Sequence, residues 1–242
     1  MVEPRNESKL LDAMLECDME TVNKLFWIVR PNKLEVYEHP LLLYAMIFCN
    51  SDIVEFIASN TDVNYIDDNG RIAIMNYIED PDRNVPETES PEIDINIITP
   101  VVKRMNINFQ DKAGYTTLNL VMSQINIDIQ VVKLLLDYGA DPLICDNITD
   151  FCPLRLALNL QNSQFIELML KNVSGKISMK FLAEAVRRGN YDAVEMLLPF
   201  IADINEFCEE FEFNQTILTY ARSQIHPNHD IIELLQEWGA NN

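Results

Sequence analysis

The stretch that decides the fold is DKAGYTTLNLV, residues 111–121, followed by VVKLLLDYGADP, residues 131–142. It reads as a turn, a short helix, a second helix and a Gly-Ala-Asp stop. The pattern returns along the chain about every 35 residues, and its last copy is IIELLQEWGANN, residues 231–242. A period of this length indicates helical pairs stacked on one another rather than a globule around one core.

Seven units align on an apolar residue of the first helix and on a second residue three positions later. Where the second residue is small, we expect the first helix to press on its neighbour, since bulk there would separate the pairs. An apolar or β-branched pair opens each second helix, and leucines at helical spacing then predict burial on one side. Gly139 and Gly239 predict the ends of their helices. The anchors are Leu10/Ala13, Leu42/Ala45, Ile74/Tyr77, Leu118/Val121, Leu154/Ala157, Leu182/Ala185 and Leu218/Ala221.

The third unit is the least regular. Its first helix is expected to run to about Ile78, and the polar, proline-containing insertion at residues 79–92 then reads as a loop. Pro100 interrupts the expected second helix. We therefore predict that this helix is kinked, or that it begins at Thr99 with Pro100 in the first helical position.

These units resemble the ankyrin repeat, whose motif reads Asp-x-x-Gly-x-Thr-Pro-Leu-His-x-Ala, then Val-Val-x-Leu-Leu-Leu and Gly-Ala-Asp-x-Asn. The resemblance implies an all-α solenoid of stacked antiparallel helix pairs with short β-turn fingers, in one domain. Its seven units are approximately 8–36, 37–66, 67–109, 110–145, 146–175, 176–208 and 209–242. The matching residues are Asp111, Gly114, Thr116, Leu118, Val131, Val132, Leu134, Leu135, Leu136, Gly139, Ala140, Asp141, Pro153, Leu154, Ala157, Asp62-Val63-Asn64 and Asp203-Ile204-Asn205.

The chain departs from the family pattern in the Thr-Pro-Leu-His turn. Only Pro153 keeps the proline, and no unit keeps the histidine. Because the family uses this turn for hydrogen bonds within and between units, we expect looser stacking here. We also expect local opening in the middle of the array, over residues 72–108. The first unit lacks a clear preceding turn and is expected to be a capping repeat.

The charge balance narrows the choice of partners. The formal charge is −20, from 38 acidic and 18 basic residues. This disfavours nucleic acid and anionic membranes, because both require Lys or Arg to neutralise phosphate. A partner protein with a basic surface is favoured, although an acidic surface that serves only solubility fits the composition equally well.

Cysteine usage and hydropathy predict a cytoplasmic protein. The five cysteines are scattered, none forms a Cys-x-x-Cys pair, and most lie in or beside apolar runs, as reduced thiols do. The amino-terminal residues are polar, and no run of 18 apolar residues is present. We therefore expect neither a secretory signal nor a membrane-spanning helix. Nuclear entry and delivery into a host cell remain open.

The resemblance implies non-catalytic protein recognition. Family members dock partners on the β-turn fingers and on the first-helix face, which together line the concave groove. Tyr115 and Phe151 are the strongest single candidates because aromatic residues are enriched in interface hot spots. The alternative is that they pack onto the next finger. Carried over position by position, the predicted contact residues are Ile66, Asp68, Asn69, Arg71, Gln110, Lys112, Tyr115, Ser123, Asn147, Asp150, Phe151, Arg187 and Arg222.

Catalysis and metal binding have little support. No nucleophile elbow, phosphate-binding glycine loop or kinase signature is present, and carboxylates are too abundant for any one pair to indicate acid–base chemistry. His226 and His229 could begin a metal site, but they flank Pro-Asn without a third ligand and read as a turn. We predict no catalytic residue, no cofactor and no metal.

Two aromatic features keep alternative interpretations. Trp27 and Trp238 close the second helices of the first and last units, where they serve as end caps or else form a self-association surface. We expect a monomer. Phe207, Phe211 and Phe213 lie among glutamates, where they either grip a basic, apolar peptide or fold back over the last two units.

The expected role is a free-standing adaptor or inhibitor, because the repeats fill the chain. In this the chain resembles the short, irregular ankyrin proteins of large DNA viruses, intracellular bacteria and protists that interfere with host pathways. The alternative roles are a module of a larger scaffold, against which Met1 and the tapering end argue, and a metal-binding or enzymatic protein.

Overall fold

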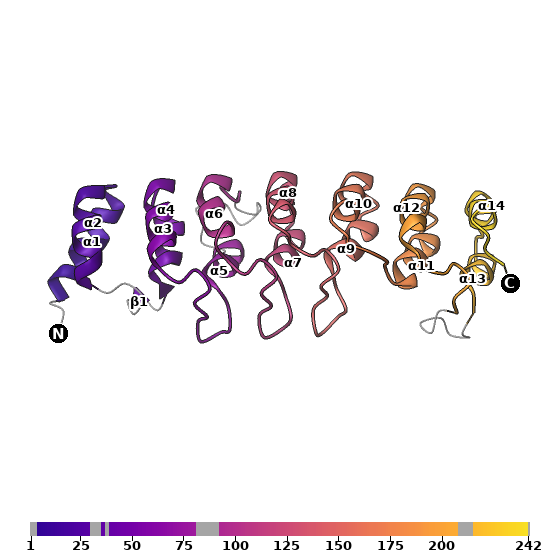
Figure 1. Ribbon diagram of the computed structural model, residues 1–242, viewed down its shortest axis with the longest axis horizontal. Helices are drawn as coiled ribbons and strands as arrows, with labels where there is room; N and C mark the ends of the chain where they lie inside the picture. Colours follow the sequence, from indigo (N-terminus) through magenta and orange to yellow (C-terminus); the bar gives the residue numbers. More distant parts are fainter. Residues whose placement is uncertain (1–3, 30–34, 37–38, 81–91, 208–214, 242) are drawn as a thin grey trace. The chain divides into compact units, whose positions relative to one another are not determined.

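The computed structural model describes residues 4–29, 35–36, 39–80, 92–207 and 215–241. The chain divides into two compact units. Unit 1 comprises Met1–Ala140 with Asp146–Thr149, and unit 2 comprises Asp141–Cys145 with Asp150–Asn242. The described residues form fourteen α-helices and one pair of two-residue strands (Figure 1). The all-α prediction is confirmed. The assignment of the chain to one domain stays a prediction.

Unit 1 contains the first eight helices. The first helices α3, α5 and α7 pack against one another in one row, and the second helices α4, α6 and α8 pack in another. The two strands pair antiparallel beside α3. The elements are α1 (Pro4–Leu15), α2 (Met19–Val29), β1 (Glu35–Val36), β2 (His39–Pro40), α3 (Leu41–Phe48), α4 (Ser51–Asn60), α5 (Ala73–Glu79), α6 (Ile95–Val102), α7 (Thr117–Met122) and α8 (Ile129–Asp137).

Unit 2 repeats the same two-row arrangement. Helix α11 packs between α9 and α13, and α12 packs between α10 and α14. The elements are α9 (Pro153–Asn159), α10 (Ser163–Leu170), α11 (Met179–Arg187), α12 (Tyr191–Leu197), the 3₁₀ turn η2 (Leu198–Phe200), α13 (Ile217–Ser223) and α14 (His229–Glu237).

The anchor residues of the sequence alignment form the core of each unit. All fourteen anchors are at most 5 % exposed. The small anchors Ala45, Ala157 and Ala185 are fully buried, as expected where first helices meet. The alignment therefore identified the inward face of every first helix.

Each of the seven second helices begins at an Asp or Asn whose side chain accepts a backbone N–H of the first turn. Such caps satisfy donors that a helix end leaves without a partner. The caps are Asp18, Asn50, Asp94, Asp128, Asn162, Asn190 and Asn228.

Of the two alternatives predicted for the second helix of the third unit, the start at Thr99 was wrong, and a kink at Pro100 stays a prediction. Helix α6 does not begin at Thr99; it begins after Asp94, whose carboxylate accepts the Asn96 N–H at 2.8 Å. Pro100 therefore lies inside the helix. A proline there costs about 3 kcal/mol. The burial of Ile98 and Val101 outweighs this cost. The first helix of this unit, α5, ends at Glu79, as predicted.

Asparagine side chains form hydrogen bonds both within a repeat and between successive repeats. Asn119 stands at the histidine position, fully buried, and forms a capping box with Thr116. In unit 1 the Asn64 side chain accepts the Asn106 N–H at 2.6 Å, and the Asn108 amide donates to the Gly139 carbonyl at 3.1 Å. Looser stacking stays a prediction, and these bonds oppose it.

Several predicted features are exposed or lie outside the described residues. Trp27 and Trp238 are 64 % and 47 % exposed, and both the end cap and the self-association surface stay predictions. Phe26 is the ring that α2 turns inward. Most of the 79–92 insertion and the aromatic cluster beyond Phe207 fall outside the described residues. In the described part of the chain, no helix is long and apolar enough to cross a membrane.

Candidate protein-binding surface

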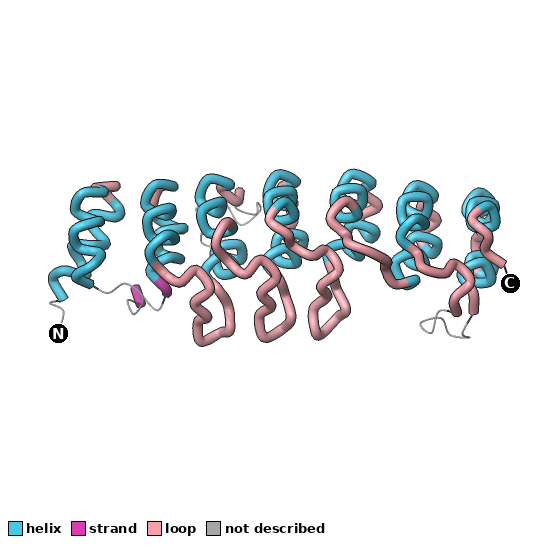
Figure 2. The backbone as a smooth tube through the Cα atoms, viewed as in Figure 1, coloured by secondary structure: helices cyan, strands magenta, loops and turns pink. Residues whose placement is uncertain are grey.

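Two fingers of unit 1 share one backbone design. In the first, at residues 67–71, Gly70 N–H donates to the Asp67 carbonyl at 2.9 Å and Asp67 N–H donates to the Arg71 carbonyl at 2.9 Å. The second, at residues 111–115, repeats both bonds, at 2.9 and 3.0 Å. Both glycines have positive φ, +84° and +87°. These bonds close each finger into a tight hairpin, which appears as a projecting loop in Figure 2.

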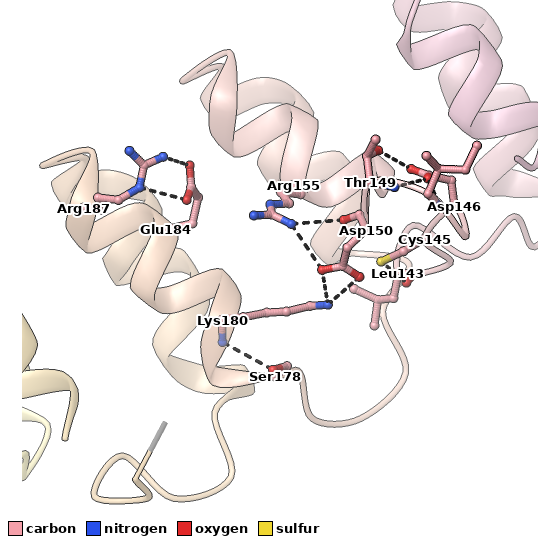
Figure 3. Close-up of polar contacts among 11 residues, drawn as sticks. Leu143, Cys145, Asp146, Thr149, Asp150, Arg155, Ser178, Lys180, Glu184 and Arg187 are labelled. Atoms are coloured by element: carbon pink, nitrogen blue, oxygen red, sulfur yellow. Dashed lines mark hydrogen bonds and ion pairs between the residues drawn. The ribbon is translucent and has the colours of Figure 1, made fainter. Parts of the chain in front are cut away.

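An aspartate holds each finger from inside. Asp67 accepts the Arg71 N–H at 2.9 Å and the Asn76 side-chain amide at 2.7 Å. Asp111 is buried and accepts the backbone N–H groups of residues 113 and 115. In the third finger of unit 1, residues 146–149, buried Asp146 accepts both the backbone N–H and the hydroxyl of Thr149 (Figure 3). These carboxylates therefore have a structural role.

The three fingers are bonded to one another as a row. The Lys112 ammonium donates to the Asp68 carbonyl at 2.7 Å, and the Asn147 N–H donates to the Ala113 carbonyl at 2.9 Å. At each of these contacts, a residue of one finger lies directly against a glycine of the preceding finger. A Cβ on Gly70 would lie 2.7 Å from the Lys112 side chain, and one on Gly114 would lie 2.7 Å from the Asn147 backbone nitrogen. We call residues 67–71, 111–115 and 146–149 the finger row.

Some of the predicted contact residues of unit 1 are exposed to solvent, and others form hydrogen bonds within the protein. Ile66, Asp68, Asn69 and Asn147 are exposed. Tyr115 is half-buried, and its role as a contact residue stays a prediction. The remaining predicted residues of unit 1 are engaged within the protein: Gln110 donates to the Gly114 carbonyl, Lys112 to Asp68, and Ser123 to the Leu120 carbonyl at the end of α7.

Arg71 is an internal tie rather than a free contact residue. Its guanidinium pairs with Glu79 of α5 and, at 3.2 Å, with Asp111 of the next finger. Partial burial opposes its charge, but the two carboxylates prevail and raise the pKa of Arg71. Arg71→Glu would place a new carboxylate beside those of Glu79 and buried Asp111, and the three negative charges would repel one another.

In unit 2, Asp150 is the centre of a polar cluster. Its carboxylate accepts from Lys180 at 3.0 Å and from Arg155 at 3.2 Å (Figure 3). The hydrogen bond from Lys180 lowers the pKa of Asp150, and burial opposes that effect only in part. Phe151 is half-buried, Arg187 pairs with Glu184, and Arg222 is exposed. Phe151, like Tyr115, is thus not a fully exposed anchor.

Comparison with solved structures agrees with this geometry. The crystal structure of the ankyrin repeat domain of Bcl-3, described as a unique member of the IkappaB protein family, aligns with a TM-score of 0.64. The alignment covers 94 % of this chain and 97 % of that chain, at 18 % identity. This chain has the ankyrin-repeat fold. The ankyrin repeat protein EF0377 is 26 % identical over 61 % of this chain and 77 % of that chain, with a TM-score of 0.47. No family model and no curated protein matches the sequence.

Sequence reasoning missed the most exposed apolar side chains of this ankyrin-repeat chain. Ile148 stands at the tip of the third finger and is 72 % exposed. Ile125 and Ile225 are 84 % and 92 % exposed, and each follows a Ser-Gln pair. In both Ser-Gln pairs, the two side chains donate to one carbonyl of the preceding helix. The repeated Ser-Gln-Ile triplet was the signal that could have revealed Ile125 and Ile225.

Metal-binding residues do not gather in the described part of the ankyrin fold. There, no group of three or more His, Cys, Asp and Glu side chains is placed to hold a metal ion. His226 and His229 are both exposed. The four described cysteines are free, and burial raises the pKa of the Cys49 thiol to about 12. That thiol is therefore protonated at neutral pH and packs as a small apolar group.

Proposed function

We propose that this chain is a non-catalytic protein-recognition module, an adaptor or inhibitor, and that it binds its partner through the finger row of unit 1. One observation carries the proposal: the three fingers are bonded to one another by contacts within this chain. A surface ordered in advance loses little conformational entropy on binding. The ankyrin-repeat fold is itself a common protein–protein interaction module.

The side chains of the finger row offer both apolar and polar contacts. Ile66 and Ile148 expose apolar surface beside and on the row. Asp68 and Asn69, on the first finger, are also exposed. The bond from Lys112 uses the backbone carbonyl of Asp68 and not its carboxylate. Apolar anchors with polar groups between them are the usual make-up of a protein-binding surface.

The charge supports a basic partner. The chain carries −20, and the lysine and arginine of the first two fingers are already bonded to neighbouring groups. A partner with a basic surface would be attracted at long range, and salt would weaken that attraction. The free thiols support action in a reducing compartment such as the cytoplasm, and like charge supports a monomer.

The test compares one triple variant and one double variant, whose substitutions lie at different places on unit 1. The finger variant is Ile66→Ser, Asp68→Lys, Ile148→Ser. The control is Ile125→Ser, Asp137→Lys, which changes the same residue types elsewhere on unit 1. Each would be immobilised beside the native chain and exposed to lysate of the source cells, and recovered proteins would be quantified by mass spectrometry.

We expect the native chain and the control to recover a common, basic protein that the finger variant loses. The purified partner should bind less tightly at 500 mM than at 50 mM salt, conditions chosen to span the range in which a Debye length falls from roughly 14 to 4 Å. A partner that the finger variant retains in full would contradict the proposal.

A further inference from the structure

The tip of the first finger contains the sequence Asn69-Gly70, and no other asparagine in the chain precedes a glycine. Asn69 is exposed. Gly70 cannot easily be another residue, because its φ is +84° and a Cβ there would meet the Lys112 side chain at 2.7 Å. The fold therefore requires the glycine and leaves an exposed asparagine directly before it.

We propose that Asn69 is a site of spontaneous, water-dependent deamidation that changes the charge of the finger row. The Gly70 backbone nitrogen attacks the side-chain carbonyl carbon of Asn69. A carbon–nitrogen bond forms, and the bond to the amide nitrogen breaks. The displaced proton of the Gly70 amide leaves with that nitrogen as ammonia. Water then opens the cyclic imide at one of its two carbonyls and leaves aspartate or isoaspartate.

Glycine makes this step accessible because it has no side chain to obstruct the attacking nitrogen. Asparagine is among the thermally labile residues of proteins, and the residue that follows it controls access. Asn147 is a built-in comparison. It is also exposed on the finger row, but the β-branched Ile148 follows it. The same chemistry is therefore hindered at Asn147.

The finger structure regulates the reaction. The Gly70 N–H is engaged with the Asp67 carbonyl at 2.9 Å, so the nitrogen reaches the Asn69 side chain only when the hairpin opens. The bond from Lys112 to the Asp68 carbonyl, at 2.7 Å, holds the same hairpin closed. Loss of that bond should raise the open population about fivefold, the factor for one hydrogen bond of about 1 kcal/mol.

The consequence for recognition rests on the proposed function. Aspartate adds a negative charge beside Asp68, and isoaspartate also adds an atom to the backbone of a hairpin that is fixed at both ends. The first product should strengthen attraction to a basic partner, and the second should displace the finger tip. The age of the protein would thus alter its docking surface.

The experiment follows the intact protein during incubation at neutral to mildly alkaline pH. Proteolysis and mass spectrometry would measure the gain in mass of the peptide that contains Asn69, with the Asn147 peptide as internal reference. Chromatographic separation of aspartate from isoaspartate would confirm passage through the imide. The variants are Asn69→Gln, in which the product should disappear, and Lys112→Met, in which it should form about fivefold faster.

A matched variant tests whether the turn itself sets the reactivity. Ala113→Asn creates a second Asn-Gly pair in the second finger, whose hairpin bonds duplicate those of the first. It should deamidate at a rate like that of Asn69. An Asn69 peptide that gains mass no faster than the Asn147 peptide would overturn the inference. Because the readout is mass rather than binding, this result is independent of the proposed function.

Discussion

At the scale of single residues, two adjacent threonines at the start of α7 have opposite roles. Thr116 is the N-cap, and its hydroxyl accepts the Asn119 N–H at 3.2 Å. The neighbouring Thr117 occupies the position at which the ankyrin motif has proline. Its hydroxyl is the one buried side-chain polar atom of the described residues that has no hydrogen-bond partner.

Replacement of Thr117 should therefore stabilise the protein. Thr117→Val keeps the shape and removes the unsatisfied hydroxyl, so the free energy of unfolding should rise by about 1 kcal/mol. The matched change Thr116→Val removes a used cap and should lower it by about 1–2 kcal/mol. Urea unfolding of both variants provides the measurement, and a fall in stability for Thr117→Val would show that the hydroxyl has a partner in solution.

The pKa of Asp150 should report the geometry of the polar cluster in unit 2. Its pKa lies below the ordinary value chiefly because of Lys180, so Lys180→Met should raise it and Arg155→Met should raise it less. Because the folded-state pKa is the lower one, the contribution to stability is present above the unfolded-state value, about 4. It is lost as the pH falls through the folded-state value. NMR titration of the carboxylate would show a reversed order if Arg155 were the dominant partner.

At the scale of elements, asparagines after the second helices connect one repeat to the next. In unit 2, the Asn205 side chain accepts the Asn241 N–H at 2.8 Å and donates to the Gly239 carbonyl at 3.1 Å. Both contacts join the turn after α12 to the end of α14. The Asn64 contact in unit 1 has the same form.

Loss of the Asn205 side chain should loosen the end of α14. In Asn205→Ala, hydrogen exchange at residues 239–241 should accelerate on the order of fivefold, which corresponds to about 1 kcal/mol for a lost bond. Asn241→Ala is the control, because its backbone N–H remains available to Asn205. Equal exchange in the two variants would mean that the asparagine contact does not hold this end.

The helices could be predicted from the sequence, whereas the roles of many polar residues could not. Apolar spacing identifies helices because burial follows the helical period, and the anchors confirm it. A helix start at Thr99 was predicted because local propensity disfavours Pro100 inside a helix. The packing of Ile98 and Val101, which allows the longer helix, depends on neighbouring helices that the local sequence does not show. Arg71 was predicted as a contact residue because its sequence position does not show that Asp111 lies within 3.2 Å.

The finger row shows the same division. The Asp-x-x-Gly pattern predicts a turn, and the structure has that turn at both copies in unit 1. The bonds between fingers could not be predicted, because Lys112 and the Asp68 carbonyl lie 44 residues apart in the chain. Exposed Ile148 was missed since the third finger lacks the glycine that marks the other two.

At the scale of the whole molecule, charge is the dominant property. The described residues include seven lysines and arginines in ion pairs with carboxylates of the same chain. The chain has 18 such cations against 38 acids, so the acids remain in excess by 20 even when every cation is counted. Mutual repulsion of these charges opposes self-association, in line with the proposed monomer.

Removal of the net charge should therefore promote association. The sequence pI is about 4.4, and light scattering should rise as the pH approaches that value from neutrality. Circular dichroism recorded in parallel separates association of folded chains from acid unfolding. Scattering that stays flat while the fold is retained would mean that charge repulsion does not control association of the chain.

The glycines of the finger row limit how the repeats can be exchanged. Lys112 lies over Gly70, and Asn147 lies over Gly114, so the side chain that fills each gap belongs to the following repeat. A repeat of unit 1 is thus not an interchangeable module. A library that shuffled these repeats would have to keep each glycine together with the residue of the next repeat that covers it. A duplicated or deleted repeat would fold only where that pairing is preserved.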